Sequence, residues 1–186
     1  MKRLICMFLI AVLALGLFSC AGSKESWKTA KYEDLKFEVL RGWAYNLPDT
    51  DYFGDTYHFG FESGTATDGF LSIREDQIMN IHFLSSMEEV GEWLALNMGR
   101  FDNSLLKDTG FSESISKGKL VINDLQAYEV VSGEVLMKGG SYYSEKYLLV
   151  EKNVVVYILS FMGPRMTQDE AERFASYYEH VKNSVN

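Results

Sequence analysis

Alternation of apolar and polar positions predicts short strands in the first half of the chain. Leu35–Val39 alternates apolar and polar side chains, as a strand with one buried face does. Tyr57–Phe61 and Phe70–Arg74 have the same short pattern, and the turn-rich residues 62–69 separate them. Residues 21–30 are polar and have no period, which is typical of a tether.

Two later segments have the period of an amphipathic helix. Ser86 with Glu89, or the competing pair Ser85 with Glu88, is typical of the capping box that begins a helix. The pair Thr167 and Glu170 predicts a second such start. Apolar residues follow each start at helical spacing. They are Met87, Val90, Leu94, Met98 and Phe101 in the first helix, and Ala171, Phe174, Ala175, Tyr178, Val181 and Val185 in the second.

The second half of the chain predicts an antiparallel meander. Its apolar segments are joined by residue pairs that favour hairpin turns, namely Asn123-Asp124, Gly139-Gly140 and Lys152-Asn153. The segments are Lys119–Ile122, Ala127–Lys138, Tyr142–Lys152 and Val154–Phe161.

The meander also has a predicted centre and predicted limits. Residues 154–159 are continuously apolar, which predicts a central strand covered on both faces. Lys107–Gly110 predicts a turn with a strand beginning near Phe111, and Gly163-Pro164 predicts the end of the last strand. The pattern as a whole predicts an α+β fold, an antiparallel sheet flanked by helices in an α/β/α sandwich, as one domain over residues 32–186.

The first twenty residues have the pattern of a cleaved leader. A basic start, Met1–Arg3, precedes fifteen uncharged residues, which are fewer than the ~20 needed to span a bilayer. Leu17–Cys20 then resembles the lipobox of bacterial lipoproteins, with Cys20 as the first mature residue. We therefore expect residues 1–19 to be a signal peptide and residues 20–31 a lipidated tether. An ordinary secretory signal or a buried core helix is the alternative.

The lipobox resemblance implies where the protein resides. A diacylglycerol on Cys20, with a possible N-acyl chain, supplies two or three hydrocarbon chains, which makes detachment from a membrane rare. The expected location is the bacterial cell envelope, and Ala21 favours the periplasmic side of the outer membrane in a diderm host. Cys6 is lost with the leader, so no free thiol remains for redox chemistry.

Composition and charge exclude several classes of protein. Apolar residues make up 47% and aromatic residues 14%, too many for a disordered chain. The 18 basic and 26 acidic residues give a net charge of −8, which disfavours nucleic acid as a partner. Loss of Lys2 and Arg3 lowers the charge to about −10, so the lipid rather than surface charge is expected to hold the domain to the membrane.

Three stretches carry a resemblance to a known fold family. They are Leu40–Trp43, the run Asn123–Tyr128 (Asn-Asp-Leu-Gln-Ala-Tyr), and Tyr147–Phe161. In their order along residues 32–186 they resemble the PsbP-like fold. That fold is shared by the PsbP protein of photosystem II, a Ran-binding nuclear transport factor and many bacterial lipoproteins. The resemblance implies the fold, and it brings no catalytic residue with it.

One acidic stretch is a candidate cation site. Asp49, Asp51 and Asp55 with His58 offer oxygen and nitrogen ligands within ten residues, although the spacing departs from that of an EF-hand loop. A solvated acidic loop is the simpler interpretation. His58, His82 and His180 form no pair at metal-binding spacing, and each is interpreted as structural.

Aromatic residues are candidates for a protein interface. The chain has 11 Tyr, 12 Phe and 3 Trp, and partly exposed Tyr and Trp are common anchors. The candidates are Trp43, Tyr52, Tyr142 and Tyr143. Tyr142 and Tyr143 are neighbours in a predicted strand and therefore point to opposite faces. The alternative is that both faces of a small sheet require large side chains.

No nucleophile elbow, phosphate-binding loop or dinucleotide fingerprint is present in the sequence. We therefore expect a non-enzymatic envelope lipoprotein without a cofactor, anchored through Cys20, that binds an envelope protein partner or supports an assembly. The alternative is a metal-binding or small-ligand-binding lipoprotein that uses the Asp49–His58 stretch. A hydrolase with a composite site is a third hypothesis.

Overall fold

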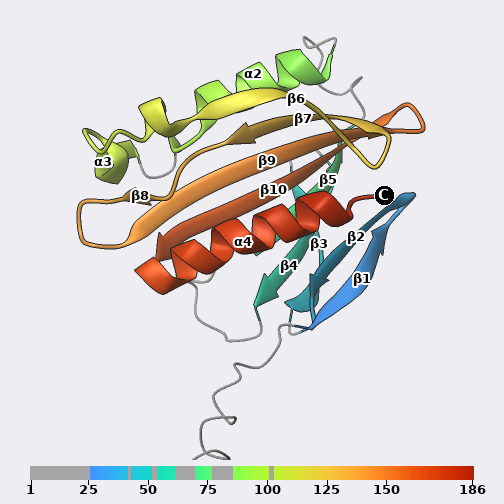
Figure 1. Ribbon diagram of the computed structural model, residues 1–186, viewed down its shortest axis with the longest axis horizontal. Coiled ribbons are helices and arrows are strands. Elements are labelled where there is room, and N and C mark those ends of the chain that lie inside the picture. Colours follow the sequence, from blue (N-terminus) through green and yellow to red (C-terminus); the bar gives the residue numbers. More distant parts are fainter. Residues whose placement is uncertain (1–25, 42, 52–53, 62–69, 77–85, 101–102) are drawn as a thin grey trace, which may run out of the picture.

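The structure is a computed structural model that describes residues 26–41, 43–51, 54–61, 70–76, 86–100 and 103–186 (Figure 1). Within residues 43–51, 54–61 and 70–76 it describes the backbone. The elements are β1 Trp27–Tyr32, β2 Leu35–Leu40, β3 Trp43–Asp51, β4 Gly54–Phe61, β5 Phe70–Asp76, α2 Met87–Asn97, α3 Asn103–Leu106, the short 3₁₀ turn η4 Ser112–Ser114, β6 Ser116–Ile122, β7 Leu125–Val131, β8 Val135–Leu136, β9 Tyr142–Lys152, β10 Val155–Met166 and α4 Gln168–Ser184.

An eight-stranded antiparallel sheet forms the middle of the molecule. Its strand order is β3-β4-β5-β10-β9-β7-β6, and the short β8 pairs with β9. The continuously apolar strand β10 is central, as predicted. Its residues alternate between two cores: Val156 and Ile158 belong to one, and Tyr157 and Leu159 to the other. The sheet is therefore covered on both faces, and the predicted α+β class is confirmed.

Helix α4 and the β1–β2 hairpin cover one face of the sheet (Figure 1). The two strands of the hairpin pair only with each other, and the buried side of β2 faces α4. Tyr32 packs edge-on against Tyr157 of β10, with ring centroids 6.1 Å apart. The first core therefore joins the beginning of the described chain to its last helix.

Helix α2 covers the other face, over β6, β7 and β9 (Figure 1). Ser86 is its N-cap and accepts from the Glu89 amide, which selects the first of the two predicted capping registers. Val90, Leu94 and Met98 of the predicted stripe are buried against the sheet. Phe101 lies outside the described residues.

The predicted tether is wrong from Trp27 onward, because residues 27–32 form β1. This strand has charged residues at Lys28 and Lys31, and Tyr32 is its one buried residue. Its own sequence therefore lacks the alternation that identifies a half-buried strand. It forms because the Glu33-Asp34 turn folds it onto β2, with six residue pairs in register.

Two predictions around the meander need correction. Phe111 begins no strand: the chain enters η4, and the Phe111 ring packs edge-on against Tyr143 at 5.3 Å. The predicted strand Ala127–Lys138 is interrupted after Val131. The chain leaves the sheet at Ser132, whose carbonyl accepts a hydrogen bond from the buried Lys146 ammonium at 3.0 Å.

The last strand and its turn also differ from the prediction. Strand β10 continues through Gly163 and Pro164 to Met166, because a register shift against β9 accommodates the missing amide of proline. The turn before β10 is formed by Asn153 and Val154, which have φ of +52° and +69°. Lys152 is the last residue of β9.

Candidate functional site

A polar groove of about 760 Å³ lies where three parts of the chain meet. The outer side of the β1–β2 hairpin supplies Lys36 and Glu38, the turn between β6 and β7 supplies Asp124, and the end of α4 supplies His180 and Ser184. Backbone hydrogen bonds between Lys36 and Asn186, 2.8 Å in each direction, join two of the residues that line the groove. The groove thus depends on contacts between residues that are far apart in sequence.

His180 of α4 lines this groove and makes several contacts there. Its Nε2 lies 2.8 Å from a carboxylate oxygen of Glu38. The imidazole stacks on the Trp27 indole, with ring centroids 3.5 Å apart and planes 12° from parallel. Trp27 also meets the Tyr177 ring edge-on at 6.0 Å. These contacts hold the first residue of β1 against α4, and they support the interpretation of His180 as structural.

Ser184, Glu38 and His180 are the residue types of a hydrolytic triad, but their hydrogen bonds do not form one. The Ser184 hydroxyl donates to the Val181 carbonyl at 2.7 Å and accepts from the Glu38 amide at 2.8 Å. A nucleophilic serine instead donates its proton to the histidine. The three residues therefore fasten α4 to β2.

Asn123 has a structural role that explains the Asn in the resemblance motif. It has a positive φ of +46° in the turn between β6 and β7. Its side-chain amide donates to the carbonyls of Asn183 and Val185, at 3.2 and 2.8 Å. Helix C-termini leave carbonyls without partners, and this amide satisfies two of them at the end of α4.

A second polar site is a pair of buried charges at adjacent positions of β9. Glu145 and Lys146 are only 3% and 7% exposed, and as neighbours in a strand they face opposite sides of the sheet. The Glu145 carboxylate accepts from the Gly99 amide at 2.8 Å, from the Tyr143 hydroxyl at 2.9 Å and from the Tyr147 hydroxyl. This carboxylate is thus satisfied by three donors.

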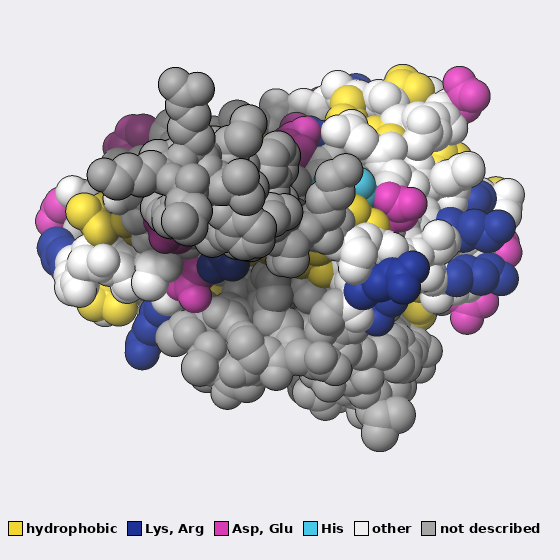
Figure 2. Space-filling view, turned by 60° about the horizontal axis from the view of Figure 1, so that its bottom comes forward, with side chains coloured by type: hydrophobic (Ala, Val, Ile, Leu, Met, Phe, Trp, Pro, Cys, Tyr) yellow, Lys and Arg dark blue, Asp and Glu magenta, His cyan; other side chains and the backbone are white. Residues whose placement is uncertain are grey.

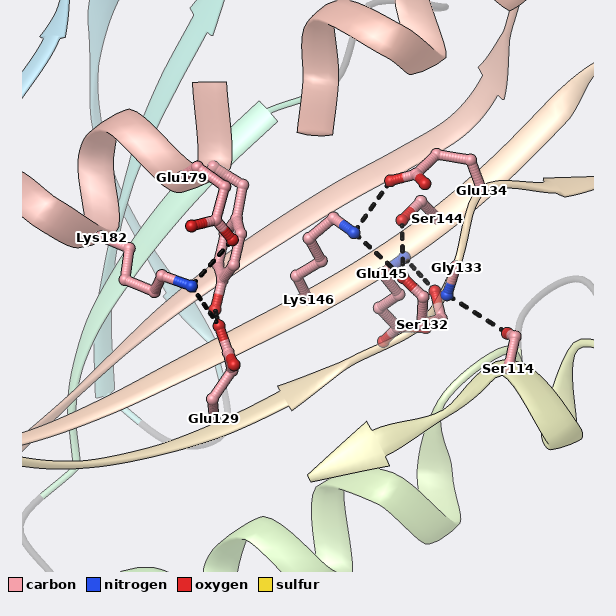
Figure 3. A network of polar contacts seen from close by, with 11 residues as sticks. Ser114, Glu129, Ser132, Gly133, Glu134, Ser144, Glu145, Lys146, Glu179 and Lys182 are labelled. Carbon is pink, nitrogen blue, oxygen red and sulfur yellow. Dashed lines mark hydrogen bonds and ion pairs between the residues drawn. The ribbon is translucent and has the colours of Figure 1, made fainter. Parts of the chain in front are cut away.

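Lys146 is held on the α4 side of the sheet (Figure 3). Its ammonium lies 2.9 Å from a carboxylate oxygen of Glu134 and donates to the Ser132 carbonyl. It also lies 5.7 Å from the centre of the Tyr178 ring. A buried ammonium with a charge partner and a carbonyl is satisfied, so the site behaves as a structural ion pair.

A third cluster joins α4 to β7 (Figure 3). Glu129 accepts from the Tyr178 hydroxyl at 2.6 Å and from Lys182 at 2.9 Å, and Lys182 also pairs with Glu179. Burial, with a further contribution from the bond to Glu129, raises the pKa of Tyr178 far above its usual value. The tyrosine therefore stays protonated and keeps donating to Glu129.

The candidate interface residues of the sequence differ in where they lie. Tyr143 is fully buried in the core under α2, so its side chain is not available for an interface. Tyr142 is half-buried. Trp43 begins β3, where the structure describes the backbone, and Tyr52 lies outside the described residues.

The candidate metal ligands lie on one hairpin. Asp49 and Asp51 belong to β3, and Asp55 and His58 to β4. In the register of this hairpin Asp49 pairs with Thr56, and Asp51 with Gly54. The stretch is thus a strand pair rather than a loop. Among the residues whose side chains are described, no three His, Cys, Asp or Glu side chains are placed to hold a metal ion.

Sequence reasoning did not identify Glu38, Glu145, Lys146 or Trp27 as residues of polar sites. Each reads alone as an ordinary surface residue or, for Trp27, as part of the tether. Their partners lie far away in sequence, 142 residues in the case of Glu38 and His180. Cys20 lies outside the described residues, and within those ranges no helix is long and apolar enough to cross a membrane.

The chain thus folds as an antiparallel sheet between helices, with a separate hairpin beside the C-terminal helix. No protein-family model and no curated protein sequence matches the chain. Among solved structures, it is similar to cyanobacterial PsbP (CyanoP) from Synechocystis sp. PCC 6803. The TM-score is 0.56 at 11% identity, over 89% of this chain and 95% of that one.

Two further structures have lower similarity. The Saccharomyces cerevisiae Ran-binding protein Mog1p has a TM-score of 0.49 at 9% identity, over 88% of this chain and 96% of Mog1p. LpqN, involved in cell envelope biogenesis of Mycobacterium tuberculosis, has a TM-score of 0.43 at 12% identity, over 88% of this chain and 91% of LpqN. At these identities the likeness concerns the fold alone. The expected PsbP-like fold is confirmed.

Proposed function

We propose that this protein is a non-enzymatic envelope lipoprotein, anchored to a membrane through lipid on Cys20, whose PsbP-like domain binds an envelope protein partner. The observation that carries the proposal is the short distance in sequence between Cys20 and Trp27, where β1 begins and packs on α4. A lipid on Cys20 would hold a folded domain directly at the membrane.

We propose a non-enzymatic role because the polar side chains of the groove and the sheet bind other groups of the fold. Glu38, His180 and Ser184 in the groove bind one another or the backbone. The buried Glu145 is satisfied by donors of the fold itself. A catalytic acid, base or nucleophile must instead face a substrate. These groups are therefore assigned to holding the elements together.

The outer side of α2 is the surface that we assign to the partner. Trp93 and Leu96 are neighbours on this helix and are 46% and 79% exposed. Large exposed apolar side chains that lie together are typical of interaction surfaces. Helix α2 also lies on the opposite face of the sheet from the β1–β2 hairpin, and so away from the proposed anchor.

The anchor is tested with Cys20→Ser in the full chain. We expect the wild-type protein to fractionate with membranes and its N-terminal peptide to gain the mass of two or three acyl chains. The variant should keep its leader or be released in soluble form. Matched Cys6→Ser, within the leader, should behave as wild type. An unmodified Cys20 in the wild-type protein would contradict the proposal.

The partner surface is tested by photo-crosslinking in intact cells. A crosslinking residue at Trp93 or Leu96 should give one discrete adduct, and Trp93→Ala with Leu96→Ala should lower the yield of a crosslink placed at Glu89. The same probe at the exposed Ser104 on α3 is the control. Equal adducts from α2 and from Ser104 would contradict this assignment.

Cation binding by the β3–β4 hairpin is a second candidate function. The register that favours it brings three aspartates close to the turn, because Asp55 pairs with Thr50 and Asp51 with Gly54. Calorimetry with Ca²⁺, Mn²⁺ and Zn²⁺ tests it. Binding heat that is lost in Asp51→Asn supports the function, and no heat at millimolar ion excludes it.

A further inference from the structure

We propose that the end of the β1–β2 hairpin that carries Lys28 and Arg41, here called the basic end, rests on the anionic headgroups of the membrane. The inference depends on the proposed lipid anchor and adds an orientation to it. The acidic domain, tethered at its N-terminus, would then have one preferred orientation, with this hairpin against the lipid surface.

The basic end is built by contacts across the hairpin. Lys28 and Arg41 are both exposed. The Lys28 ammonium donates to the Arg41 carbonyl at 3.3 Å, and the Arg41 guanidinium donates to the Trp27 carbonyl at 3.5 Å. Trp27 itself is clamped between His180 and Tyr177 of α4. Two cations are therefore fixed beside the first residue of β1.

Chain length places this end close to the membrane. Six residues, Ala21–Ser26, separate Cys20 from Trp27. At no more than ~3.5 Å per residue, the seven steps from Cys20 to Trp27 span at most about 25 Å. The anchor therefore cannot let the start of β1 move farther than this from the lipid surface. The tether does not fix the orientation of the domain relative to the membrane.

The distribution of charge selects that direction. The segment 20–186 has 16 basic and 26 acidic residues, but residues 27–41 have four cations and three anions. Two of these anions, Glu33 and Asp34, lie in the turn at the other end of the hairpin, and Glu38 is paired with His180. The basic end is thus positively charged, whereas the chain as a whole has more acidic than basic residues.

Figure 2 turns the lower side of Figure 1 forward and shows several Lys and Arg side chains toward the right, with Asp and Glu side chains beside them. The three aspartates of the β3–β4 hairpin lie far from this end. Strand β3 begins just after β2, at Trp43, and Asp49 and Asp51 lie six and eight residues along it, about 20 and 26 Å away. Asp55 pairs with Thr50 at the same end of the hairpin.

An anionic surface attracts a nearby lysine or arginine by about 1 kcal/mol each and repels carboxylates, within a screening length of about 10 Å at 0.1 M salt. A tethered domain therefore turns its cations inward and its acidic parts outward. Because α2 lies on the opposite face of the sheet from the hairpin, this orientation also keeps the exposed Trp93 and Leu96 away from the membrane.

The test uses the full lipidated protein in vesicles of phosphatidylcholine, with or without 30% phosphatidylglycerol. A nitroxide is attached to a cysteine introduced at the exposed Thr29 on β1 or at the exposed Ser104 on α3. Relaxation by a nickel-chelating lipid reports how close each label is to the headgroups. With phosphatidylglycerol, we expect strong relaxation at position 29 and little at position 104, and a loss of this contrast at 0.5 M salt.

The variant Lys28→Glu with Arg41→Glu should reduce the ratio of relaxation between the two positions by at least about fivefold for each cation removed. Lys28→Gln with Arg41→Gln gives the same direction with less repulsion and covers the case in which the first variant does not fold. The matched control, Lys107→Glu with Lys138→Glu, makes the same charge change at exposed lysines near α3 and should keep the contrast.

The outcomes separate this inference from the proposed function. A protein that floats with both kinds of vesicle but relaxes equally at positions 29 and 104 overturns the orientation and leaves the anchor standing. Contrast that is unchanged by the variants, or equally strong without phosphatidylglycerol, also overturns it. A protein that floats with neither kind of vesicle overturns the anchor itself.

Discussion

At the scale of single residues, the buried Glu145 and Lys146 of β9 determine where the neighbouring strand β7 ends. Lys146 draws the Ser132 carbonyl toward itself, and Ser132 in turn accepts the Glu145 amide on its hydroxyl at 2.9 Å. Strand β7 therefore ends at Val131 instead of continuing along β9. On the other face, the Glu145 carboxylate receives the amide of Gly99, which has a φ of +72° just beyond α2.

Removal of the Glu145 carboxylate should cost much of the stability of the domain. Glu145→Ala removes the carboxylate to which the buried Gly99 amide and Tyr143 hydroxyl donate, so we expect a loss of about 3–5 kcal/mol in the free energy of unfolding. Glu151→Ala, at an exposed position of the same strand, should change it by less than about 0.5 kcal/mol. Urea unfolding followed by circular dichroism measures both, and equal effects would contradict the role of Glu145.

Val154 should be the easiest residue at which to stabilise the protein. It has a φ of +69° in a two-residue turn and is 89% exposed, so it has backbone strain without compensating burial. Val154→Gly gives the Asn-Gly pair that such turns favour, and we expect a gain of about 0.5–1 kcal/mol. Val121→Gly, exposed within β6, should destabilise by a similar amount. A lower melting temperature for Val154→Gly would contradict the expectation.

At the scale of elements, the sequence predicts best what depends on neighbouring residues. The capping box of α4 is present as predicted: Thr167 accepts from the Glu170 amide, and its own amide donates to the Glu170 carboxylate at 2.7 Å. The start of α2 and the bounds of β9 are equally local. Strand β1 and the buried Tyr177 were missed, because β1 is held by its pairing with β2 and Tyr177 packs against the distant Trp27.

The cluster that joins α4 to β7 predicts a loss of stability in alkali. Burial holds the pKa of Tyr178 above its usual value of 10.0, so above pH 10 the unfolded chain loses the phenol proton while the folded chain keeps it. Stability therefore falls as the pH rises above 10. Tyr178→Phe has no such proton, and its deficit relative to wild type should shrink by about 1.4 kcal/mol between pH 8 and pH 11. Urea titrations at several pH values measure this, and a constant deficit would exclude it.

At the scale of the whole molecule, the class of fold followed from the sequence but the strand order and the groove did not. The apolar segment 154–159 indicated a central strand, and β10 is central. Nothing local indicates that β5 pairs with β10, across separations of 80 to 92 residues. The groove brings together Glu38, Asp124 and His180 from three distant segments, so its residues carry no shared signal in the sequence.

The boundary of the folded unit gives a prediction at this scale. A chain that begins at Ser26 retains β1, whereas one that begins at Glu33 loses the strand with its buried Tyr32 and leaves β2 without its paired strand. We expect the shorter chain to lose at least about 4 kcal/mol, as for removal of a large buried aromatic residue. Tyr32→Ala, which keeps the backbone, should lose about 3 kcal/mol or more. Melting curves compare the three, and coincident curves would place the boundary after Tyr32.

The hydrogen bond that joins α4 to β2 has a consequence for the order of folding during biosynthesis. The Glu38 amide bonds the Ser184 hydroxyl, 146 positions later in the chain. While a ribosome is still extending the polypeptide, the amino-terminal hairpin has no cover and the first core cannot close. Contacts of such wide separation also form slowly. A nascent polypeptide with this topology therefore closes its first core only after its last helix has emerged.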